Sequence, residues 1–323
     1  MAYTVQKMPA YQDVDGFRLT AMFSPDIFRA ALQYQPRADD LFIVTYPKCG
    51  TTWMQNIVLL ILNKGIPLTD FLQFQKATPF LEMTGPDSAK HMKRPGAIKT
   101  HLPFRLQPYS PEAKYIYVVR NPKDCCVSFY YHTKNSPGYH FQDGTFDDFF
   151  EIFIRGETDY GDYFDHLLSW YEHRNDPNVL FITFEEMKMD MRTAVLKIAK
   201  FLGIEYAENL ENDDDLLKRV LVYSSFDYMR KSHEQSVNEF FHKGLDSITN
   251  DPNVPEGLKH VIKSLKNSEQ SSGNIPNIIR KGIIGDWKNH FTEEQSQRMD
   301  DIFFEKTKGT EVRKLWEGLE NEI

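Results

Sequence analysis

The chain has 323 residues, is 41% hydrophobic and carries a formal net charge of -8 at pH 7. This length is enough for one large α/β domain, and because no repeat, low-complexity tract or Pro/Gly/Ser-rich linker divides the sequence, we expect a single domain over residues 1–323. The acidic balance argues against a nucleic-acid partner, so any bound anion must rely on local basic residues.

The apolar runs and the cysteines predict a cytoplasmic protein. Residues 1–10 lack the apolar core of a signal peptide, and the longest purely aliphatic run, Ile57 to Leu62, is too short to cross a membrane. The three cysteines, Cys49, Cys125 and Cys126, form neither a disulfide framework nor a paired metal-binding pattern. We therefore expect a reducing compartment, no membrane contact and no metal site.

The first chemically informative segment joins a predicted strand to a predicted helix. Leu41 to Thr45 is short, apolar and β-branched, whereas Trp53 to Asn63 repeats its apolar positions at helical spacing. A helix that begins near Gly50 would point its free N–H groups and the positive end of its dipole into the connecting loop. The loop T-Y-P-K-C-G-T-T-W (45–53) therefore predicts a cradle for phosphate or sulfate.

The residue types in this loop suit an oxyanion. Gly50 permits close approach of the backbone, Thr51 and Thr52 supply hydroxyls, and Lys48 adds a full charge. A strand-turn-helix needs a glycine in any case, so Gly50 alone indicates little. The segment is not a Walker A sequence, because the lysine precedes the glycine, and an ordinary ATPase is disfavoured.

A histidine ends the next strand-like piece. Residues 98–103 have the sequence I-K-T-H-L-P, in which a histidine is followed closely by a proline. Imidazole is the side chain whose ordinary pKa lies nearest neutrality, so His101 is a candidate general base. A lone histidine is more often structural, and the chain holds 10 of them.

A second candidate anion site follows the apolar stretch Tyr115 to Val119, which predicts a buried strand. Charge begins where this strand ends, in the string R-N-P-K-D (120–124). Ligands of open parallel sheets collect beyond the carboxyl ends of strands, so Arg120 is well placed for a phosphate, and the hydroxyl of Ser128 could bond the same group. Taken alone, solvated charges explain this segment equally well.

The third candidate site is R-K-G-I-I-G-D-W (280–287), where a basic pair and two glycines follow a polar stretch. Backbone N–H groups beside glycine form anion nests. Three anion-binding segments spaced so widely along the chain favour a nucleotide with two anionic ends over a single phosphate.

These strings resemble the motifs of the cytosolic sulfotransferases, which transfer a sulfuryl group from 3′-phosphoadenosine 5′-phosphosulfate (PAPS) to a hydroxyl or amine of a small acceptor. The loop at 45–53 is similar to the family's 5′-phosphosulfate loop except at Cys49, where the family usually has serine. R-N-P-K-D-x-x-V-S and R-K-G-x-x-G-D-W are similar to its 3′-phosphate motifs. The resemblance covers residues 40–292 and implies a central parallel sheet flanked by helices, with a P-loop-like anion-binding loop after an early strand.

The resemblance also implies the cofactor contacts. PAPS, which leaves as adenosine 3′,5′-bisphosphate, would be held without a metal. At position 184 the family commonly has a tyrosine that bonds the adenine, a bond that Phe184 cannot make. The residues implied for the sulfate end, the 3′-phosphate and the adenine are, respectively, Lys48, Cys49, Gly50, Thr51 and Thr52; Arg120, Ser128, Arg280, Lys281 and Gly282; and Trp53, Ser224, Ser225 and Phe226.

K-T-H-L-P is like the string in which the family carries its catalytic histidine. In the implied mechanism His101 deprotonates the acceptor, which attacks sulfur directly and in line. Lys48 offsets the charge that grows on the bridging oxygen, and Lys99 contacts the nonbridging oxygens.

The implied acceptor is a small molecule such as a phenol, a catecholamine-like amine or a steroid alcohol, and an apolar aromatic pocket would suit planar phenols. Asp143 could pair with the amine of a phenolic amine. The residues expected to line this pocket are Phe80, Phe104, Tyr139, Phe141 and Asp143.

Two regions depart from the family pattern. Residues 227–279, which would form a lid, are longer than usual and include the polar run 266–273. The family's dimer motif K-x-x-x-T-V-x-x-x-E is altered, because Glu293 replaces the apolar valine between Thr292 and Gln297. The sequence therefore leaves open whether the protein forms a homodimer.

Two other functions stay open from the sequence. A nucleotide or nucleoside kinase would need Mg²⁺ ligands, and the strand before Arg120 lacks the terminal Asp of a Walker B segment. A non-catalytic protein that binds nucleotide and small phenols is the other alternative, although the presence of both Lys48 and His101 argues against it.

Overall fold

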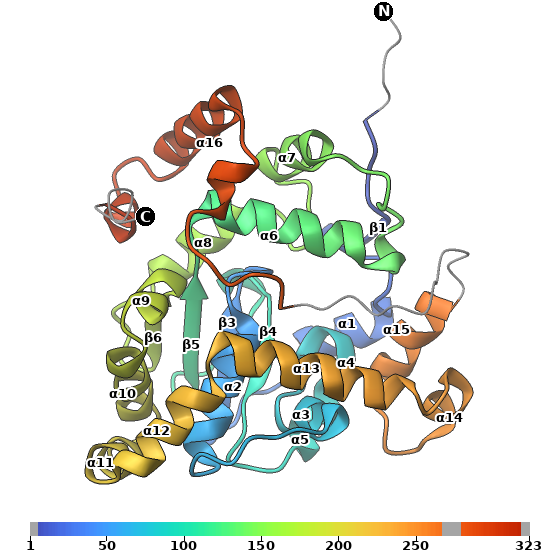
Figure 1. The fold of residues 1–323 in the computed structure, drawn as a ribbon. Helices are drawn as coiled ribbons and strands as arrows, with labels where there is room; N and C mark the ends of the chain where they lie inside the picture. The colour runs from blue at the N-terminus through green and yellow to red at the C-terminus, as the bar shows by residue number, and fades with distance from the viewer. Residues whose placement is uncertain (1–5, 267–278, 318–323) are drawn as a thin grey trace, which may run out of the picture.

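A parallel sheet of four strands lies at the centre of the structure, a computed structural model that describes residues 6–266 and 279–317 (Figure 1). The strand order is β4-β3-β5-β6, and each neighbouring pair is parallel. The strands are β3 (Leu41–Thr45), β4 (Ile98–Thr100), β5 (Lys114–Val119) and β6 (Val179–Thr183).

Both faces of this sheet are buried, as the continuous apolar strand sequences require. On β3, Phe42 and Val44 face one core, whereas Leu41 and Ile43 face the other. The first core is aromatic and lies under α6 (Pro122–Asn135), α7 (Phe146–Ile154), α8 (Tyr163–Tyr171), α1 (Pro25–Leu32) and α16 (Glu293–Lys306). The second core is aliphatic and lies under α2 (Thr51–Leu62), α9 (Phe184–Met189), α10 (Met191–Leu202), α11 (Ile204–Asn212) and α12 (Asp214–Tyr223).

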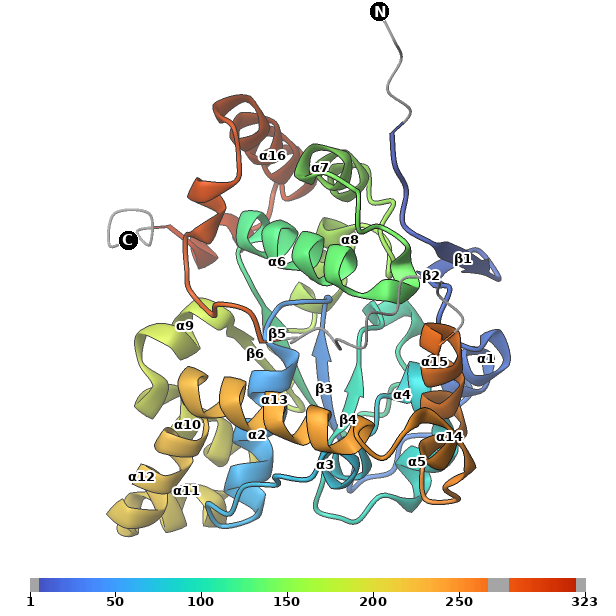
Figure 2. The same cartoon turned by 45° about the vertical axis from the view of Figure 1, so that its right-hand side comes forward.

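A third group of helices contains most of the region expected to be a lid. This group comprises α13 (Phe226–Phe241), α14 (Leu245–Asn250) and α15 (Glu256–Lys266), and it crosses the front of the molecule in Figures 1 and 2. Phe240, Ile248 and Leu258 form a small core of their own, which packs on Phe71 of α3 (Phe71–Ala77) and Met83 of α4 (Leu81–Thr84). Residues 267–278 of the expected lid lie outside the described residues.

Short elements complete the chain. The strands β1 (Tyr11–Val14) and β2 (Phe17–Thr20) form an antiparallel hairpin, which the sequence analysis did not predict. The other short elements are α5 (Pro86–His91), η1 (Phe104–Leu106), η2 (Pro137–Tyr139), η3 (Asp286–Asn289) and η4 (Val312–Leu315).

The predicted fold class, a single α/β domain with a central parallel sheet flanked by helices and an anion-binding loop after an early strand, is confirmed. Three predicted strands correspond to β3, β4 and β5, and the helix predicted at 53–63 begins slightly earlier, at Thr51. In the altered dimer motif, Thr292 caps α16 in a capping box with Gln295, and Glu293 is an acid of the first turn. None of the helices within residues 6–266 and 279–317 is long and apolar enough to cross a membrane.

The topology places the chemically informative segments at one edge. Because β3 pairs with both β4 and β5 in parallel, the residues that follow Thr45, Thr100 and Val119 all leave the sheet at its carboxyl edge. These residues are the loop that contains Lys48, the histidine His101 and the arginine Arg120.

Candidate active site

The loop between β3 and α2 is shaped as an anion cradle. Gly50 is the N-cap of α2 with φ +106°, a left-handed conformation that favours glycine, and a Cβ there would lie 3.0 Å from the Phe184 ring. No side chain caps this helix, and its first turn holds no acid. The N–H groups of the first turn therefore remain available to a ligand in the loop.

Lys48 lies in this loop among other positive charges. Burial lowers the pKa of Lys48 to about 7, and repulsion from Lys99, Arg120 and Arg280 adds to this shift. Burial likewise lowers the pKa of Lys99 to about 8. A bound anion would reverse both shifts, because it favours the charged form of each amine.

Arg120 follows β5 and is almost fully buried. Its Nη2 donates to the Ile283 carbonyl at 2.9 Å, its guanidinium lies 4.5 Å from the centre of the Phe184 ring, and its buried Nε has no partner among the described residues. Ser128, on α6, lines the same cavity. The guanidinium thus retains donor capacity for a phosphate.

The segment 280–287 is tied to α6 by a buried carboxylate. Asp124 accepts hydrogen bonds from the backbone N–H groups of Gly285 at 2.7 Å and Trp287 at 3.0 Å. Within the segment, Arg280 Nη2 lies 2.6 Å and Lys281 Nζ 2.8 Å from carboxylate oxygens of Asp286. The second and third predicted anion sites are therefore one structural unit.

Asp286 is held ionised by these contacts. Burial favours its neutral form, but hydrogen bonds from Lys281 and Arg280 keep the pKa of Asp286 below its usual range. Gly282 has φ +62°, and a Cβ there would lie 2.4 Å from the Phe226 ring, so the segment packs directly on the start of α13.

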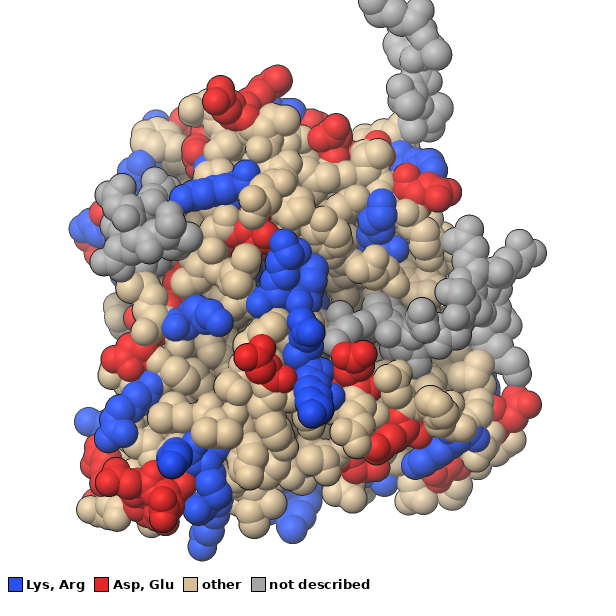
Figure 3. Space-filling model, in the orientation of Figure 1, with Lys and Arg blue, Asp and Glu red and all other residues tan. Residues whose placement is uncertain are grey.

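The three segments open into one cavity of about 400 Å³. The face in Figure 3 shows Lys and Arg side chains gathered down its middle, although the whole chain is acidic. This local excess of positive charge meets the need for basic residues at an anion site. The basic residues that line the cavity are Lys48, Lys99, Arg120, Lys188, Arg280 and Lys281.

His101 lies in the same cavity with a defined tautomer. Its Nδ1 lies 2.8 Å from the Thr45 carbonyl, which can only accept a hydrogen bond, so Nδ1 carries the proton. Nε2 is then the basic nitrogen of the ring. Burial, followed by the positive charge of Lys99, holds the pKa of His101 well below its ordinary value, so the imidazole is neutral at physiological pH.

Glu82, which the sequence analysis did not identify, positions this histidine. Its Oε1 accepts the backbone N–H of His101 at 2.6 Å, and burial raises the pKa of the Glu82 carboxyl to about 7. On the other side, His166 Nε2 lies 3.0 Å from the His101 carbonyl and its Nδ1 lies 2.9 Å from the Tyr117 hydroxyl. His101 is thereby fixed by buried contacts on both sides.

Aromatic rings surround the histidine. The ring of Phe80 lies 5.0 Å and that of Tyr160 lies 5.2 Å from the imidazole, and Phe23 packs on Phe80 at 5.4 Å. Phe80 and Tyr139, both predicted to bind the acceptor, line the cavity. The cavity therefore combines a cationic end with an aromatic end, and His101 lies between them.

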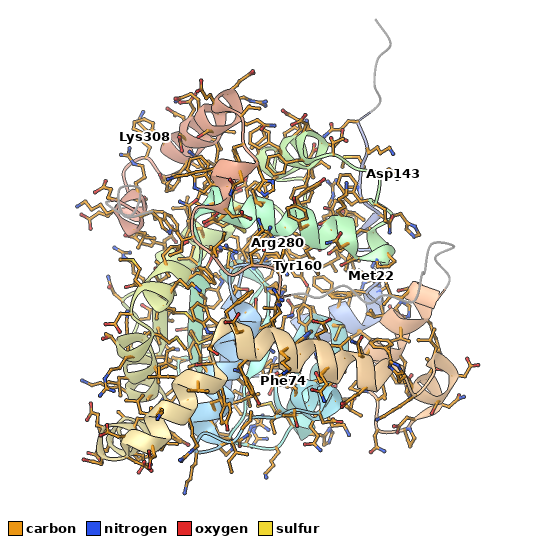
Figure 4. All side chains as sticks on the ribbon, in the orientation of Figure 1. Met22, Phe74, Asp143, Tyr160, Arg280 and Lys308 are labelled. Carbon is orange, nitrogen blue, oxygen red and sulfur yellow. The ribbon has the colours of Figure 1, made fainter. Side chains whose placement is uncertain are left out.

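Three residues predicted for the acceptor pocket lie outside the cavity lining. Phe104 stacks on His173 at 3.5 Å, and Phe141 is buried in the aromatic core beneath Gly144. The side chain of Asp143 is 81% exposed and pairs with Lys7, and Figure 4 shows Asp143 at the edge of the molecule, away from Tyr160. Neighbouring packing in the loop, which the sequence pattern does not specify, decides these orientations.

Three residues predicted for the cofactor site also point elsewhere. The side chain of Cys49 is buried, with its sulfur 3.6 Å from that of Cys125. The hydroxyls of Ser224 and Ser225 donate to carbonyls of the preceding helix α12, at Val220 and Val222. Ser224 acts through its carbonyl instead, which accepts from Trp53 Nε1 at 2.9 Å and orients that ring.

The remaining predicted residues of the cofactor site do line the cavity, namely Lys48, Gly50, Thr51, Thr52, Trp53, Arg120, Ser128, Phe226, Arg280, Lys281 and Gly282. The sequence analysis missed the apolar wall that α13 and α15 contribute and the carboxylate of Asp159. No local motif marks these residues. The missed residues of the wall are Met229, His233, Val237, Phe241, Leu258, Val261, Ile262 and Leu265.

We predict that Asp124→Asn loosens the segment 280–287, because an amide cannot accept both N–H bonds as a carboxylate does. Loss of one such bond is worth about 1.5 kcal/mol, so amide exchange at Gly285 or Trp287 should accelerate about tenfold. Hydrogen-exchange mass spectrometry of this segment measures the effect. Asp165→Asn, which removes a carboxylate that pairs with Lys306 away from this segment, is the control, and equal exchange in both variants would contradict the role of Asp124.

Known proteins resemble the chain over most of its length. The family model of the sulfotransferase domain matches residues 38–259 and 257–311. Sulfotransferase 1C2 of Rattus norvegicus is 32% identical, covering 97% of each chain, and the amine sulfotransferase of Oryctolagus cuniculus is 34% identical, covering 88% of this chain and 86% of its own.

A solved structure agrees with these relatives. The mouse sulfotransferase SULT7A1, crystallised with PAP, is 31% identical, has a TM-score of 0.71, and covers 97% of this chain and 99% of its own. The match of the family model and the identity of the relatives, together with a cavity that unites the three anion-binding segments, place this chain in the sulfotransferase family.

Proposed function

We propose that this enzyme transfers the sulfuryl group of PAPS to a hydroxyl or amine of a small acceptor, a phenol or a phenolic amine, with His101 as the general base. One observation carries the proposal. A single cavity holds three cationic anion-binding segments at one end, aromatic rings at the other, and a neutral buried histidine between them.

The described residues fit a nucleotide with two anionic ends. Lys48, Gly50, Thr51 and Thr52 would hold the sulfate end, and Trp53 and Phe226 would hold the adenine. The unpartnered Nε of Arg120 and the hydroxyl of Ser128 supply donors for a 3′-phosphate, together with Arg280, Lys281 and Gly282. The PAP bound to mouse SULT7A1 supports this assignment. When bound, PAPS supplies the sulfuryl group and is released as adenosine 3′,5′-bisphosphate.

The residues of the chain then have separate tasks. The Nδ1 contact with Thr45 fixes the His101 tautomer, so that Nε2 receives the proton of the acceptor. Lys48 would offset negative charge that grows on the leaving oxygen, and Lys99, whose Nζ lies 3.9 Å from the centre of the Phe80 ring, would contact the nonbridging oxygens. The pKa of His101, which burial and Lys99 hold low, would rise towards neutrality beside bound anions and so suit proton transfer.

The acceptor end favours flat aromatic molecules. Phe23, Phe80, Tyr139 and Tyr160 line it, and their rings offer stacking surfaces that suit a phenol. The relatives include an amine sulfotransferase, which supports a nitrogen-bearing acceptor.

The direct test is transfer of labelled sulfate from PAPS to a panel of phenols, catecholamines and steroid alcohols in the presence of excess chelator. We expect sulfated product and an equal amount of adenosine 3′,5′-bisphosphate. Strict dependence on ATP and Mg²⁺ would instead indicate a kinase, and tight nucleotide binding without any transfer would indicate a non-catalytic binding protein.

We predict that His101→Ala lowers turnover by ~10² to 10⁴, the range for loss of a positioned acid-base group, while the Kd for adenosine 3′,5′-bisphosphate stays within about threefold. Steady-state kinetics and calorimetry measure the two effects. His233→Gln is the matched control, because His233 lines the same cavity from α13 and should lower turnover much less. Near-normal turnover of His101→Ala would remove it from the mechanism.

Arg120→Ala should weaken binding of adenosine 3′,5′-bisphosphate by about 1.5 to 3 kcal/mol, the value of a charge-assisted hydrogen bond. Calorimetry measures this loss. Arg298→Ala removes an arginine that pairs with Glu151 on the outer helices and should leave nucleotide affinity unchanged. An unchanged Kd in Arg120→Ala would contradict the 3′-phosphate assignment.

A further inference from the structure

A buried carboxylate lies at the aromatic end of the cavity. Asp159 follows α7 in the loop that leads to α8, it is 2% exposed, and it lines the cavity together with Tyr160. We infer that Asp159 binds the ammonium group of an aminoalkyl phenol and selects such acceptors over neutral phenols. This inference rests on the proposed function, whose acceptor class it narrows.

One of the two carboxylate oxygens of Asp159 is available to accept a hydrogen bond from a ligand. The Tyr139 hydroxyl donates to Oδ2 at 2.7 Å, whereas Oδ1 is buried and has no hydrogen-bond partner among the described residues. A buried polar atom without a partner is rare and costs free energy unless a ligand satisfies it. An N–H group of the acceptor, entering the cavity, would supply this missing bond.

Charge favours an ammonium group over a neutral donor. No described Lys, Arg or His forms a salt bridge with Asp159, and burial raises the pKa of its carboxyl to about 7. Of the Lys and Arg residues that line the cavity, Lys99 lies on β4 and Lys188 on α9, whereas the others belong to the three anion-binding segments. A cationic acceptor would stabilise the ionised carboxylate and form a charge-assisted bond.

The loop that carries Asp159 is held in place before any ligand binds. The N–H of Tyr160 donates to the Arg18 carbonyl at 3.0 Å, the Tyr46 hydroxyl donates to the Gly161 carbonyl at 2.9 Å, and Arg18 Nη1 donates to the Glu157 carbonyl at 2.7 Å. Tyr160 itself has φ +67°, a conformation that non-glycine residues adopt when their surroundings fix them. The carboxylate is therefore preorganised.

The position of Asp159 suits an acceptor that extends from His101 to Asp159. Its neighbour Tyr160 contacts the His101 ring, so the loop borders the reacting centre. An acceptor whose hydroxyl meets His101 can extend an aminoalkyl chain along the Tyr160 ring towards Asp159. Asp143, the carboxylate predicted for this role, cannot serve it, because it lies at the surface with Lys7.

Calorimetry on the full chain saturated with adenosine 3′,5′-bisphosphate tests the inference without requiring turnover. The probes are 4-hydroxybenzylamine, tyramine, the neutral alcohol tyrosol and 4-ethylphenol. Asp159→Asn keeps an acceptor for the Tyr139 hydroxyl but loses the charge. We expect this variant to bind at least one of the two amines about tenfold to a hundredfold more weakly, and 4-ethylphenol within about threefold of wild type.

Asp143→Asn is the matched control and should leave all four affinities unchanged. Unchanged amine binding in Asp159→Asn, or an equal loss for 4-ethylphenol, would overturn the inference; a loss for tyrosol as large as for tyramine would show that Asp159 recognises a neutral hydroxyl instead. Sulfate transfer by the wild type is measured in parallel. Amine binding that depends on Asp159 without any transfer would support the inference and contradict the proposed function.

Discussion

The structure depends on one electrostatic constraint, the gathering of positive charge in a partly enclosed cavity of an acidic protein. Burial lowers the pKa values of both Lys48 and Lys99, and repulsion from Lys99, Arg120 and Arg280 lowers that of Lys48 further. Such a cluster is unfavourable without anions, since removing charged groups from water costs free energy and the like charges repel one another. A ligand with several negative charges would remove this cost. The cluster of positive charge therefore favours binding of an anionic nucleotide.

Carboxylates outside the cavity position the cationic segments, and Asp286 offsets part of their charge. Asp124 ties the segment 280–287 to α6, and Asp286 spaces Arg280 and Lys281. Glu82 fixes the backbone of His101. Because the strands β4, β3 and β5 are neighbours in one parallel sheet, the loop of Lys48, His101 and Arg120 meet at its carboxyl edge. His101 and the anion cradle are therefore adjacent through topology, although they are distant in the chain.

The features that could be predicted from the sequence are those that depend on the local geometry of strands, loops and helices. A strand followed by Gly50 and an uncapped helix defines an anion cradle by itself, and Arg120 at a strand end follows from the parallel sheet. Side-chain direction within loops was not predictable in this way. Asp143 and Asp159 are both loop carboxylates near aromatic residues, yet only Asp159 is turned inwards, by backbone bonds to the N-terminal hairpin that the sequence did not reveal. The wall formed by α13 and α15 likewise depends on distant contacts with α3 and α4.

The most direct test of the account is the number of protons taken up when adenosine 3′,5′-bisphosphate binds. Calorimetry at pH 8 in buffers of different ionisation enthalpy gives this number. In the free protein Lys48, with a pKa of about 7, is mostly neutral at that pH and Lys99, with a pKa of about 8, is half neutral, so binding that charges both amines should take up about 1.4 protons. Affinity should accordingly fall as the pH rises above about 7, and Lys48→Met should reduce the uptake. Binding without proton uptake, or with proton release, would contradict a nucleotide held by these buried amines.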